Sequence, residues 1–228
     1  MPPSHSYCQV FSGLIREHWS DLNAFTRTAH FERNEVIFSV GDLPGAMYLI
    51  ELGRVKLSQL SPDGEEKIMG ILQKGDIVGE VCLCKKGPRE NQAVALESVD
   101  VTAFRVNGLL QVLQSKPEMV FSLVMIFCAR MLECHDKVAS LAFDEVRGRL
   151  VKEMLRLSEL AASQGERNSV ELPVHLTHQE LANLVSTTRD NVTRIMNEFR
   201  KDGLVDYSRE KIVIFPDKLE KYLRLLGA

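Results

Sequence analysis

A strict heptad repeat in the middle of the chain is the feature that most restricts its fold. Apolar residues recur there at alternating steps of four and three residues over about three heptads. An α-helix with this spacing carries them on one narrow seam, which either packs on its own domain or pairs with the same seam of a second copy. The length and regularity of the repeat favour a homodimer. The predicted interface residues are Val120, Val124, Phe127, Met131, Cys134, Val138 and Leu141.

Ahead of this helix, from about Phe31 to Val106, the chain consists of short β-rich runs cut by turn signals. Examples of the runs are Met47–Ile50, Val55–Ser58 and Val99–Thr102. Many short strands at nearly even spacing predict a sandwich or a barrel, with Phe11–Ala24 as a short helical lead-in. The turn signals are Gly41-Asp42, Gly53, Pro62-Asp63-Gly64, Gly75-Asp76 and Gly87-Pro88.

Beyond the heptad helix, a second helical stretch over Val146–Ala162 is followed by a polar loop and then by two short helices. Thr177 and Glu180 form a capping box that begins the first short helix, and Ser186-Thr187 is a tight turn. Thr188 caps the second helix, which is predicted to run to about Lys201. The arrangement predicts a helix-turn-helix.

The second short helix has an apolar face and a polar face. The polar face suits DNA, because arginine binds guanine and a carboxylate accepts a hydrogen bond from cytosine. A solvated charged helix without a DNA-binding role is the alternative for the second short helix. A hairpin around Ser208–Glu210 would form a wing. The predicted DNA contacts are Thr177, Thr188, Arg189, Asp190, Thr193, Arg194, Asn197, Arg209 and Lys211.

The charge of the whole chain hides a difference between its two parts. A formal net charge of -3 and a pI of about 6.1 argue against a nucleic-acid partner. Residues 147–228, however, hold 14 Lys and Arg against 12 Asp and Glu, whereas the preceding residues hold 14 against 19. The helix-turn-helix part is therefore positive on balance and the β-rich part negative.

Neither export nor membrane insertion is expected. No N-terminal segment joins a basic start to an apolar run, and the longest apolar stretch, Met119–Ala129, is well short of the ~20 residues of a bilayer span. We therefore expect a cytoplasmic protein with reduced thiols. The five cysteines, which do not form a zinc-type double pair, are Cys8, Cys82, Cys84, Cys128 and Cys134.

Catalysis and metal binding are not expected either. The six histidines form no His-x-His set within the predicted strands, and no phosphate-binding loop of the G-x-x-x-x-G-K type is present. The sequence predicts no catalytic residue and no metal ligand.

The order of short motifs resembles one family over nearly the whole chain. The β-rich part shows Glu35–Phe38, Gly41-Asp42, Met47–Ile50, Gly53–Lys56, Gly75-Asp76 and Gly79-Glu80, and the second short helix begins Arg189-Asp190-Asn-Val-Thr-Arg194. Together these resemble bacterial transcription regulators of the cyclic-AMP receptor/FNR family.

The resemblance implies an α+β fold in three parts. These are an N-terminal β-roll of the cyclic-nucleotide-binding, jelly-roll type over residues 1–116, a long dimerisation helix and hinge over 117–144, and a winged helix-turn-helix over 145–228. It also implies a homodimer that binds double-stranded palindromic DNA and that acts with RNA polymerase.

The resemblance further implies an effector site in the β-roll. There a Gly-Glu pair starts a short helix whose amides cradle a phosphate, the glutamate binds a ribose hydroxyl and an arginine pairs with the phosphate. Cys134-His135 align with the pair that contacts adenine. The implied effector residues are Gly79, Glu80, Val81, Cys82, Arg89, Glu90, Asn91, Cys134 and His135.

The identity of the effector stays open at this point. Cyclic AMP, cyclic di-GMP and no small ligand are alternatives, and Glu80 and Arg89 could instead form a structural ion pair. Oxygen sensing would need a cysteine cluster where only Cys8 stands, and haem ligation would need a histidine where Lys85 and Lys86 stand. The alternative functions are a nucleotide-binding regulator that acts on a protein partner, and a DNA-binding regulator of this kind that senses redox state or haem or has no small-molecule effector.

Overall fold

The protein is described by a computed structural model that covers residues 3–84, 87–161, 169–208 and 211–226. The chain divides into two compact units, Met1–Asp136 and Lys137–Ala228. The division falls inside the long helix α4 (Pro117–Phe143). The three-part division by residue ranges stays a prediction.

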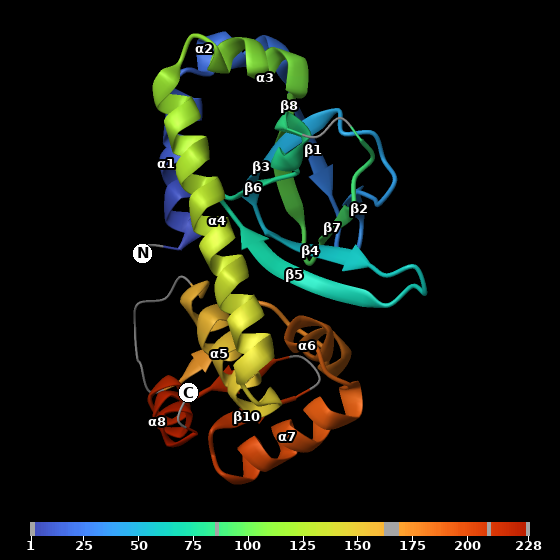
Figure 1. Cartoon of the computed structure of the whole chain (residues 1–228), viewed down its shortest axis with the longest axis vertical. Coiled ribbons are helices and arrows are strands. Elements are labelled where there is room, and N and C mark those ends of the chain that lie inside the picture. The colour runs from blue at the N-terminus through green and yellow to red at the C-terminus, as the bar shows by residue number, and fades with distance from the viewer. Residues whose placement is uncertain (1–2, 85–86, 162–168, 209–210, 227–228) are drawn as a thin grey trace. The chain divides into compact units, whose positions relative to one another are not determined.

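The first unit is built on a β-roll of two four-stranded antiparallel sheets (Figure 1). This confirms the β-roll that the family resemblance implied. One sheet has the order β1-β8-β3-β6, with strands β1 (Thr26–Phe31), β8 (Val99–Arg105), β3 (Ala46–Leu52) and β6 (Ile77–Val78). The other has the order β2-β7-β4-β5, with strands β2 (Val36–Phe38), β7 (Asn91–Ala95), β4 (Arg54–Leu60) and β5 (Glu66–Gln73).

Two apolar clusters hold this unit together. One gathers side chains from both sheets, among them Ile50, Val55 and Val99, which are fully buried. Alternate residues of a strand point to opposite faces, so each sheet can supply this cluster and still present a second face. The other cluster joins Phe104 of β8 to the helices that cover the β-roll.

The covering helices are α1 (Ser4–Glu17), α2 (Trp19–Leu22), α3 (Val106–Leu113) and the first part of α4, with short 3₁₀ turns at η1 (Asn23–Phe25) and η2 (Glu80–Leu83). The predicted lead-in helix over Phe11–Ala24 was wrong in its bounds. The helix begins at Ser4, after the extended residue Pro3, and its first turn is anchored by contacts with distant parts of the chain. It ends at His18, where the backbone leaves helical geometry.

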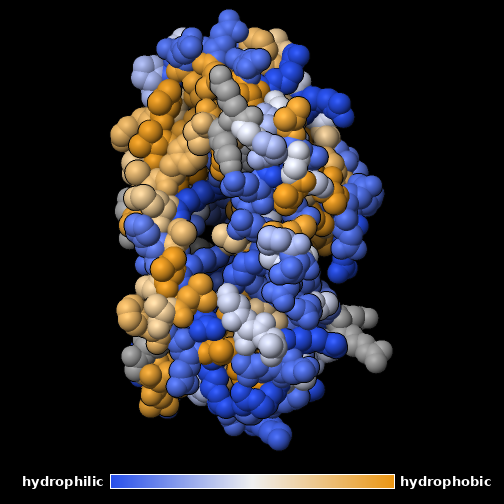
Figure 2. Space-filling model, turned by 45° about the vertical axis from the view of Figure 1, so that its right-hand side comes forward, coloured by the Kyte–Doolittle hydropathy of each residue, from blue (hydrophilic) through white to orange (hydrophobic). Residues whose placement is uncertain are grey.

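Helix α4 has two apolar faces. One is buried in the first unit and contains Met119, Ser122, Leu123, Ile126 and Ala129. The seam predicted from the heptads lies on another face, and its residues are exposed, from 38% at Phe127 to 60% at Val138. Hydrophobic side chains gather along the left edge of Figure 2, the side on which α4 lies.

The second unit contains the helix-turn-helix and a small sheet. Its helices are α5 (Val146–Glu159), α6 (His178–Val185), α7 (Arg189–Lys201) and α8 (Pro216–Leu225). The sheet has the order β10-β11-β9, with strands β10 (Val205–Tyr207), β11 (Ile212–Ile214) and β9 (Val170–Glu171). The two strands of the predicted wing, β10 and β11, are paired, whereas β9 and α8 were not predicted from the sequence.

Two helical glycines give a matched test of packing in the first unit. A Cβ at Gly108 in α3 would lie 2.1 Å from Cγ of Phe25, whereas a Cβ at Gly13 in α1 would meet nothing within 4 Å. We predict that Gly108→Ala lowers the free energy of unfolding by about 1–3 kcal/mol through overpacking. Gly13→Ala should raise it by up to ~1 kcal/mol, because alanine favours helix.

Urea unfolding followed by the fluorescence of Trp19 measures both variants, because this residue is the single tryptophan and lies in the first unit. Equal midpoints for the two variants would contradict the close contact with Phe25.

Candidate functional site

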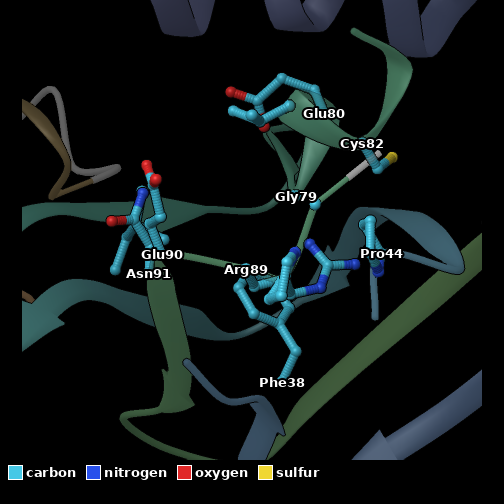
Figure 3. Close-up of a pocket in the computed structure, with 12 residues that line it drawn as sticks. Phe38, Pro44, Gly79, Glu80, Cys82, Arg89, Glu90 and Asn91 are labelled. Carbon is cyan, nitrogen blue, oxygen red and sulfur yellow. The ribbon is translucent and has the colours of Figure 1, made fainter. Parts of the chain in front are cut away.

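The β-roll contains a cavity of about 110 Å³ beside η2 (Figure 3). The effector residues expected in the β-roll all line it, whereas Cys134 and His135 do not and are exposed on α4. The lining residues are Phe38, Pro44, Leu57, Gly79, Glu80, Val81, Cys82, Gly87, Pro88, Arg89, Glu90 and Asn91.

Arg89 is held in the cavity by backbone and aromatic contacts. Its Nη2 donates to the carbonyl oxygen of Ala46 at 2.5 Å, and its guanidinium lies 3.9 Å from the centre of the Phe38 ring. Gly79 has a φ of 79°, and a Cβ there would come within 2.6 Å of Nη1 of Arg89. Only glycine therefore satisfies both the backbone conformation and the approach of the guanidinium.

Glu80 pairs with Arg130 of α4 and not with Arg89. Arg130 also donates to the carbonyl oxygen of Ile77 at 2.6 Å. Burial lowers the pKa of Arg130, but the neighbouring groups, first among them the Glu80 carboxylate, together raise it by more than burial lowers it. The net pKa of Arg130 therefore lies above its usual value. Figure 3 shows Glu80 pointing away from Arg89. The alternative of a Glu80–Arg89 ion pair was therefore wrong.

Arg130 was missed from the sequence because nothing near it in the chain indicates its partner. The one sequence feature that points to a buried Arg130 is that this charged residue follows Ala129, which is buried, in an otherwise apolar helix segment. Such a charge is seldom buried unless it is paired.

Helix α1 contacts two other segments, the turn between β5 and β6 and helix α4. Nδ1 of His5 lies 2.7 Å from Oδ1 of Asp76, and the backbone N–H of Gln73 donates to the other oxygen of that carboxylate at 2.8 Å. The backbone N–H of Ser4 donates to Glu133 at 2.7 Å. Burial raises the pKa of the Cys8 thiol to about 11, so this thiol is protonated and unreactive at neutral pH.

The His5–Asp76 contact predicts a pH-dependent stability. The hydrogen bond to Asp76 raises the pKa of His5, an effect that burial partly opposes. A raised pKa in the folded state contributes stability that is complete below the ordinary value of 6.5 and is lost as the pH rises through the folded value. We therefore expect the urea midpoint of the first unit to decrease as the pH rises through the pKa of His5 in the folded protein. His5→Gln should make the midpoint less dependent on pH.

The measurement is the urea midpoint by Trp19 fluorescence at a series of pH values. His135→Gln is the control, since His135 is exposed and makes no ion pair among the described residues. An unchanged pH slope in His5→Gln would rule out the contribution of this contact.

Helices α6 and α7 (Figure 1) begin with the caps that the sequence predicted. Oγ1 of Thr177 accepts from the backbone N–H of Glu180 at 3.2 Å, and the Glu180 carboxylate accepts from the N–H of Thr177 at 3.0 Å. Ser186 ends α6 in the left-handed region with a φ of 56°, and Thr188 caps α7. These local hydrogen bonds confirm the predicted start of each helix.

Helix α7 buries Val192, Ile195, Met196 and Phe199 and exposes most of its predicted DNA-contacting residues. Arg189 and Asp190 are exposed and make no ion pair within the part of the chain that is described. Nη1 of Arg194 lies 2.9 Å from Glu198, and its Nη2 donates to Asn191 at 2.7 Å. The side chain of Arg194 is therefore engaged within α7, whereas those of Arg189 and Asp190 form no ion pair among the described residues.

Thr193 is engaged inside the unit. Its hydroxyl donates to the carbonyl oxygen of Arg189 at 2.9 Å, so the hydrogen bond of 2.9 Å to Nδ1 of His178 uses the histidine as donor. Burial and the charge of Arg189 lower the pKa of His178, which keeps its ring neutral at pH 7. Thr193 can reach DNA with its methyl group while these bonds hold.

The remaining predicted DNA contacts lie outside α7. Thr177 and Thr188 are exposed at the helix starts, and Lys211 lies 3.7 Å from Glu171. Arg209 lies outside the described residues.

The described residues contain neither a membrane-spanning helix nor a cluster of metal-binding side chains. No helix there combines the length and the apolar character that a membrane span requires. No group of three or more His, Cys, Asp or Glu side chains in the same residues is placed to hold a metal ion.

Two protein-family models match the chain. Residues 28–116 match the cyclic nucleotide-binding domain, and residues 148–222 match the Crp-like helix-turn-helix domain. The first of these ranges contains the cavity, and the second contains α6, α7 and the wing.

Relatives match over most of their length. The chain is 25% identical over 205 residues to a CRP-like cAMP-activated global transcriptional regulator of Mycobacterium tuberculosis, which covers 90% of this chain and 91% of the relative. It is 27% identical over 196 residues to the cyclic AMP receptor protein of Thermus thermophilus, with 86% and 87% covered.

A solved structure shows the same fold. The c-di-GMP responsive global regulator CLP of Xanthomonas campestris matches with a TM-score of 0.77 at 22% identity, over 88% of this chain and 99% of that one.

Proposed function

The chain belongs to the CRP/FNR family of DNA-binding transcription regulators, and we propose that it acts as a homodimer whose β-roll binds a cyclic nucleotide and thereby repositions its two recognition helices on palindromic DNA. The observation that carries the proposal is the presence, in one chain, of Arg89 in a cavity of the β-roll and, at the start of α7, of Arg189 and Asp190, which form no ion pair among the described residues.

The DNA half of the proposal rests on the chemistry of α7. Arg189 offers two donors to O6 and N7 of guanine, and Asp190 can accept from N4 of cytosine. The family motif has glutamate where Asp190 stands, and the shorter side chain reaches less far into the groove. To contact a base, Arg194 gives up its contacts with Glu198 and Asn191. Thr177, Thr188 and Lys211, with Arg209, bind the phosphate backbone.

The effector half rests on Arg89. Its guanidinium suits a phosphate, and Gly79 lets the ligand approach the backbone. A cavity of about 110 Å³ is small beside the ~300–1,000 Å³ of ordinary ligand sites. Binding therefore requires the site to open, and Glu80 can leave Arg130 for a ribose hydroxyl. Cys134 and His135 would join the ligand in the effector-bound dimer.

The choice of nucleotide depends on Glu90, which lines the cavity beside Arg89. A carboxylate near a phosphate is repulsive, whereas a carboxylate near a base accepts from amino groups. Cyclic AMP and cyclic di-GMP are both candidates, in keeping with the names of the Mycobacterium and Xanthomonas relatives.

The dimer part of the proposal rests on the exposed seam of α4. An apolar groove of about 370 Å³ continues the seam, because Val120, Val124 and Phe127 belong to both. Monomers seldom leave so large an apolar surface uncovered. The other lining residues of the groove are Leu83, Leu110, Leu113, Gln114 and Leu123.

We further propose that the regulator works without catalysis, in the cytoplasm, through RNA polymerase. The alternative, a nucleotide-binding regulator that acts on a protein partner, leaves α7 without a role.

One experiment tests both the DNA and the effector halves. A palindromic duplex is first enriched from a random pool by the wild-type protein at ~100 mM salt, since affinity depends on salt. Arg189→Ala should weaken binding to this duplex by about 5- to 150-fold, the worth of a bidentate contact. Of cyclic AMP, cyclic GMP and cyclic di-GMP, one should change the wild-type affinity, and Arg89→Ala should abolish that change.

Two exposed arginines serve as controls. Arg224→Ala in α8 should leave DNA affinity as it is, and Arg33→Ala should keep the response to the nucleotide. Enrichment of no duplex would refute the DNA half and favour the protein-partner alternative. If calorimetry detects no heat of binding for any of the three nucleotides, the effector half alone is refuted.

The dimer is tested with the cysteine of the seam. Cys134 would face its counterpart across the two-fold axis, so mild oxidation by copper phenanthroline and dioxygen should join two chains through a disulfide, with loss of a proton and an electron from each thiol. Cys134→Ser should abolish the cross-linked dimer on non-reducing gels, whereas Cys84→Ser, at an exposed cysteine away from the seam, should not. Cross-linking that survives Cys134→Ser and disappears in Cys84→Ser would overturn the proposed seam.

A further inference from the structure

Tyr207 of the wing strand β10 contacts α7, the helix proposed to read the DNA. The hydroxyl of Tyr207 donates to Oδ1 of Asn197 at 2.8 Å. Asn197 is exposed on α7, one helical turn beyond Arg194 and on the side opposite the buried Val192 and Phe199. A wing residue thus sets the orientation of a side chain on the DNA-facing surface.

The ring of Tyr207 is itself fixed from two sides. The ring of His178 meets it edge-on with centroids 5.3 Å apart, and the guanidinium of Arg200 lies 5.1 Å from its centroid. His178 is hydrogen-bonded to Thr193, and Arg200 forms an ion pair with Asp206 at 3.2 Å. Because both neighbours are anchored, the tyrosine hydroxyl has a defined position.

This position decides which end of the Asn197 amide is available. The carbonyl oxygen is held toward the wing strand, and the amide nitrogen lies on the other side of the group. That nitrogen has no hydrogen-bond partner among the described residues, since the bond to Tyr207 is the one contact of this side chain. The amide therefore offers donors to an incoming ligand.

We propose that Tyr207 is a positioning residue for base recognition, which holds Asn197 with its NH₂ group toward the DNA. The inference deepens the proposed DNA binding and rests on it. A donor suits O6 and N7 of guanine and O4 of thymine, whereas cytosine presents only an amino group and adenine presents an amino group beside its N7 acceptor, so both are less favourable partners for a donor. Without the tyrosine hydroxyl the amide can turn over and present its oxygen, which accepts from adenine or cytosine.

The test is the base preference of four proteins in a selection from random duplexes. Wild type should favour guanine or thymine on one strand at the position that faces Asn197. Tyr207→Phe keeps the ring and removes the hydroxyl, so this preference should fall by roughly two- to ten-fold, the worth of one hydrogen bond. Asn197→Ala should abolish the preference, and Tyr207→Phe should have no additional effect in the Asn197→Ala background.

Tyr222→Phe is the matched control, because Tyr222 of α8 packs edge-on against Phe199 in the same unit and has no contact with Asn197. It should leave every base preference unchanged. A preference that Asn197→Ala removes but Tyr207→Phe leaves intact overturns the positioning role. So does an equal change at all positions of the site, which would indicate a general loss of fold.

The outcomes also separate this inference from the proposed function. Specific enrichment by wild type with no effect of Asn197→Ala overturns the inference and leaves DNA binding standing. A wild-type protein that enriches no duplex overturns both.

Discussion

The buried ion pair between Glu80 and Arg130 is the interaction on which the cavity and the long helix both depend. The two side chains keep 10% and 19% of their surface exposed, and each charge would be costly to bury without the other. Glu80 belongs to the wall of the cavity and Arg130 to α4. Any ligand that takes the carboxylate must therefore leave a buried guanidinium unpaired or move the helix that carries it.

The position of Arg130 ties this pair to the exposed seam. Met131, the next residue of α4, is a seam residue, and consecutive residues of an α-helix are about 100° apart around its axis. A rotation of this part of α4 that carried Arg130 away from Glu80 would turn Met131 by the same angle. Because an interdigitated seam would tolerate few rotations, the cavity and the proposed dimer contact could not be adjusted independently. A ligand can use that link only through its different affinity for the two arrangements.

The features that the sequence predicted correctly depend on residues close together in the chain. The capping box at Thr177, the cap at Thr188 and the seam of α4 are all set by spacings of three or four residues. The features that it missed depend on distant partners. The start of α1 is fixed by Ser4 with Glu133 and by His5 with Asp76, at separations of 129 and 71 residues.

The same distinction holds within the effector site. The Gly79-Glu80 motif placed these residues beside Arg89 in one cavity, as the family resemblance implied. The partner of Glu80 stands 50 residues away on α4, and no periodicity links the two positions. Pairing of this kind is decided by tertiary packing, so the motif predicted the wall of the cavity but not what its carboxylate binds.

The charges around α7 determine how this surface can recognise DNA. Several of its basic residues already face acids: Arg194 faces Glu198, Arg200 faces Asp206 and Lys211 faces Glu171. Each such pair offers phosphates less charge than a solvated cation, so fewer counterions are released and the affinity should depend only moderately on salt. Discrimination between sequences then has to come from short hydrogen bonds whose geometry is set before the DNA arrives. The contacts that hold Asn197 and Thr193 in place supply that geometry, and in the proposed function they leave Arg189 and Asp190 to make the first contacts with bases.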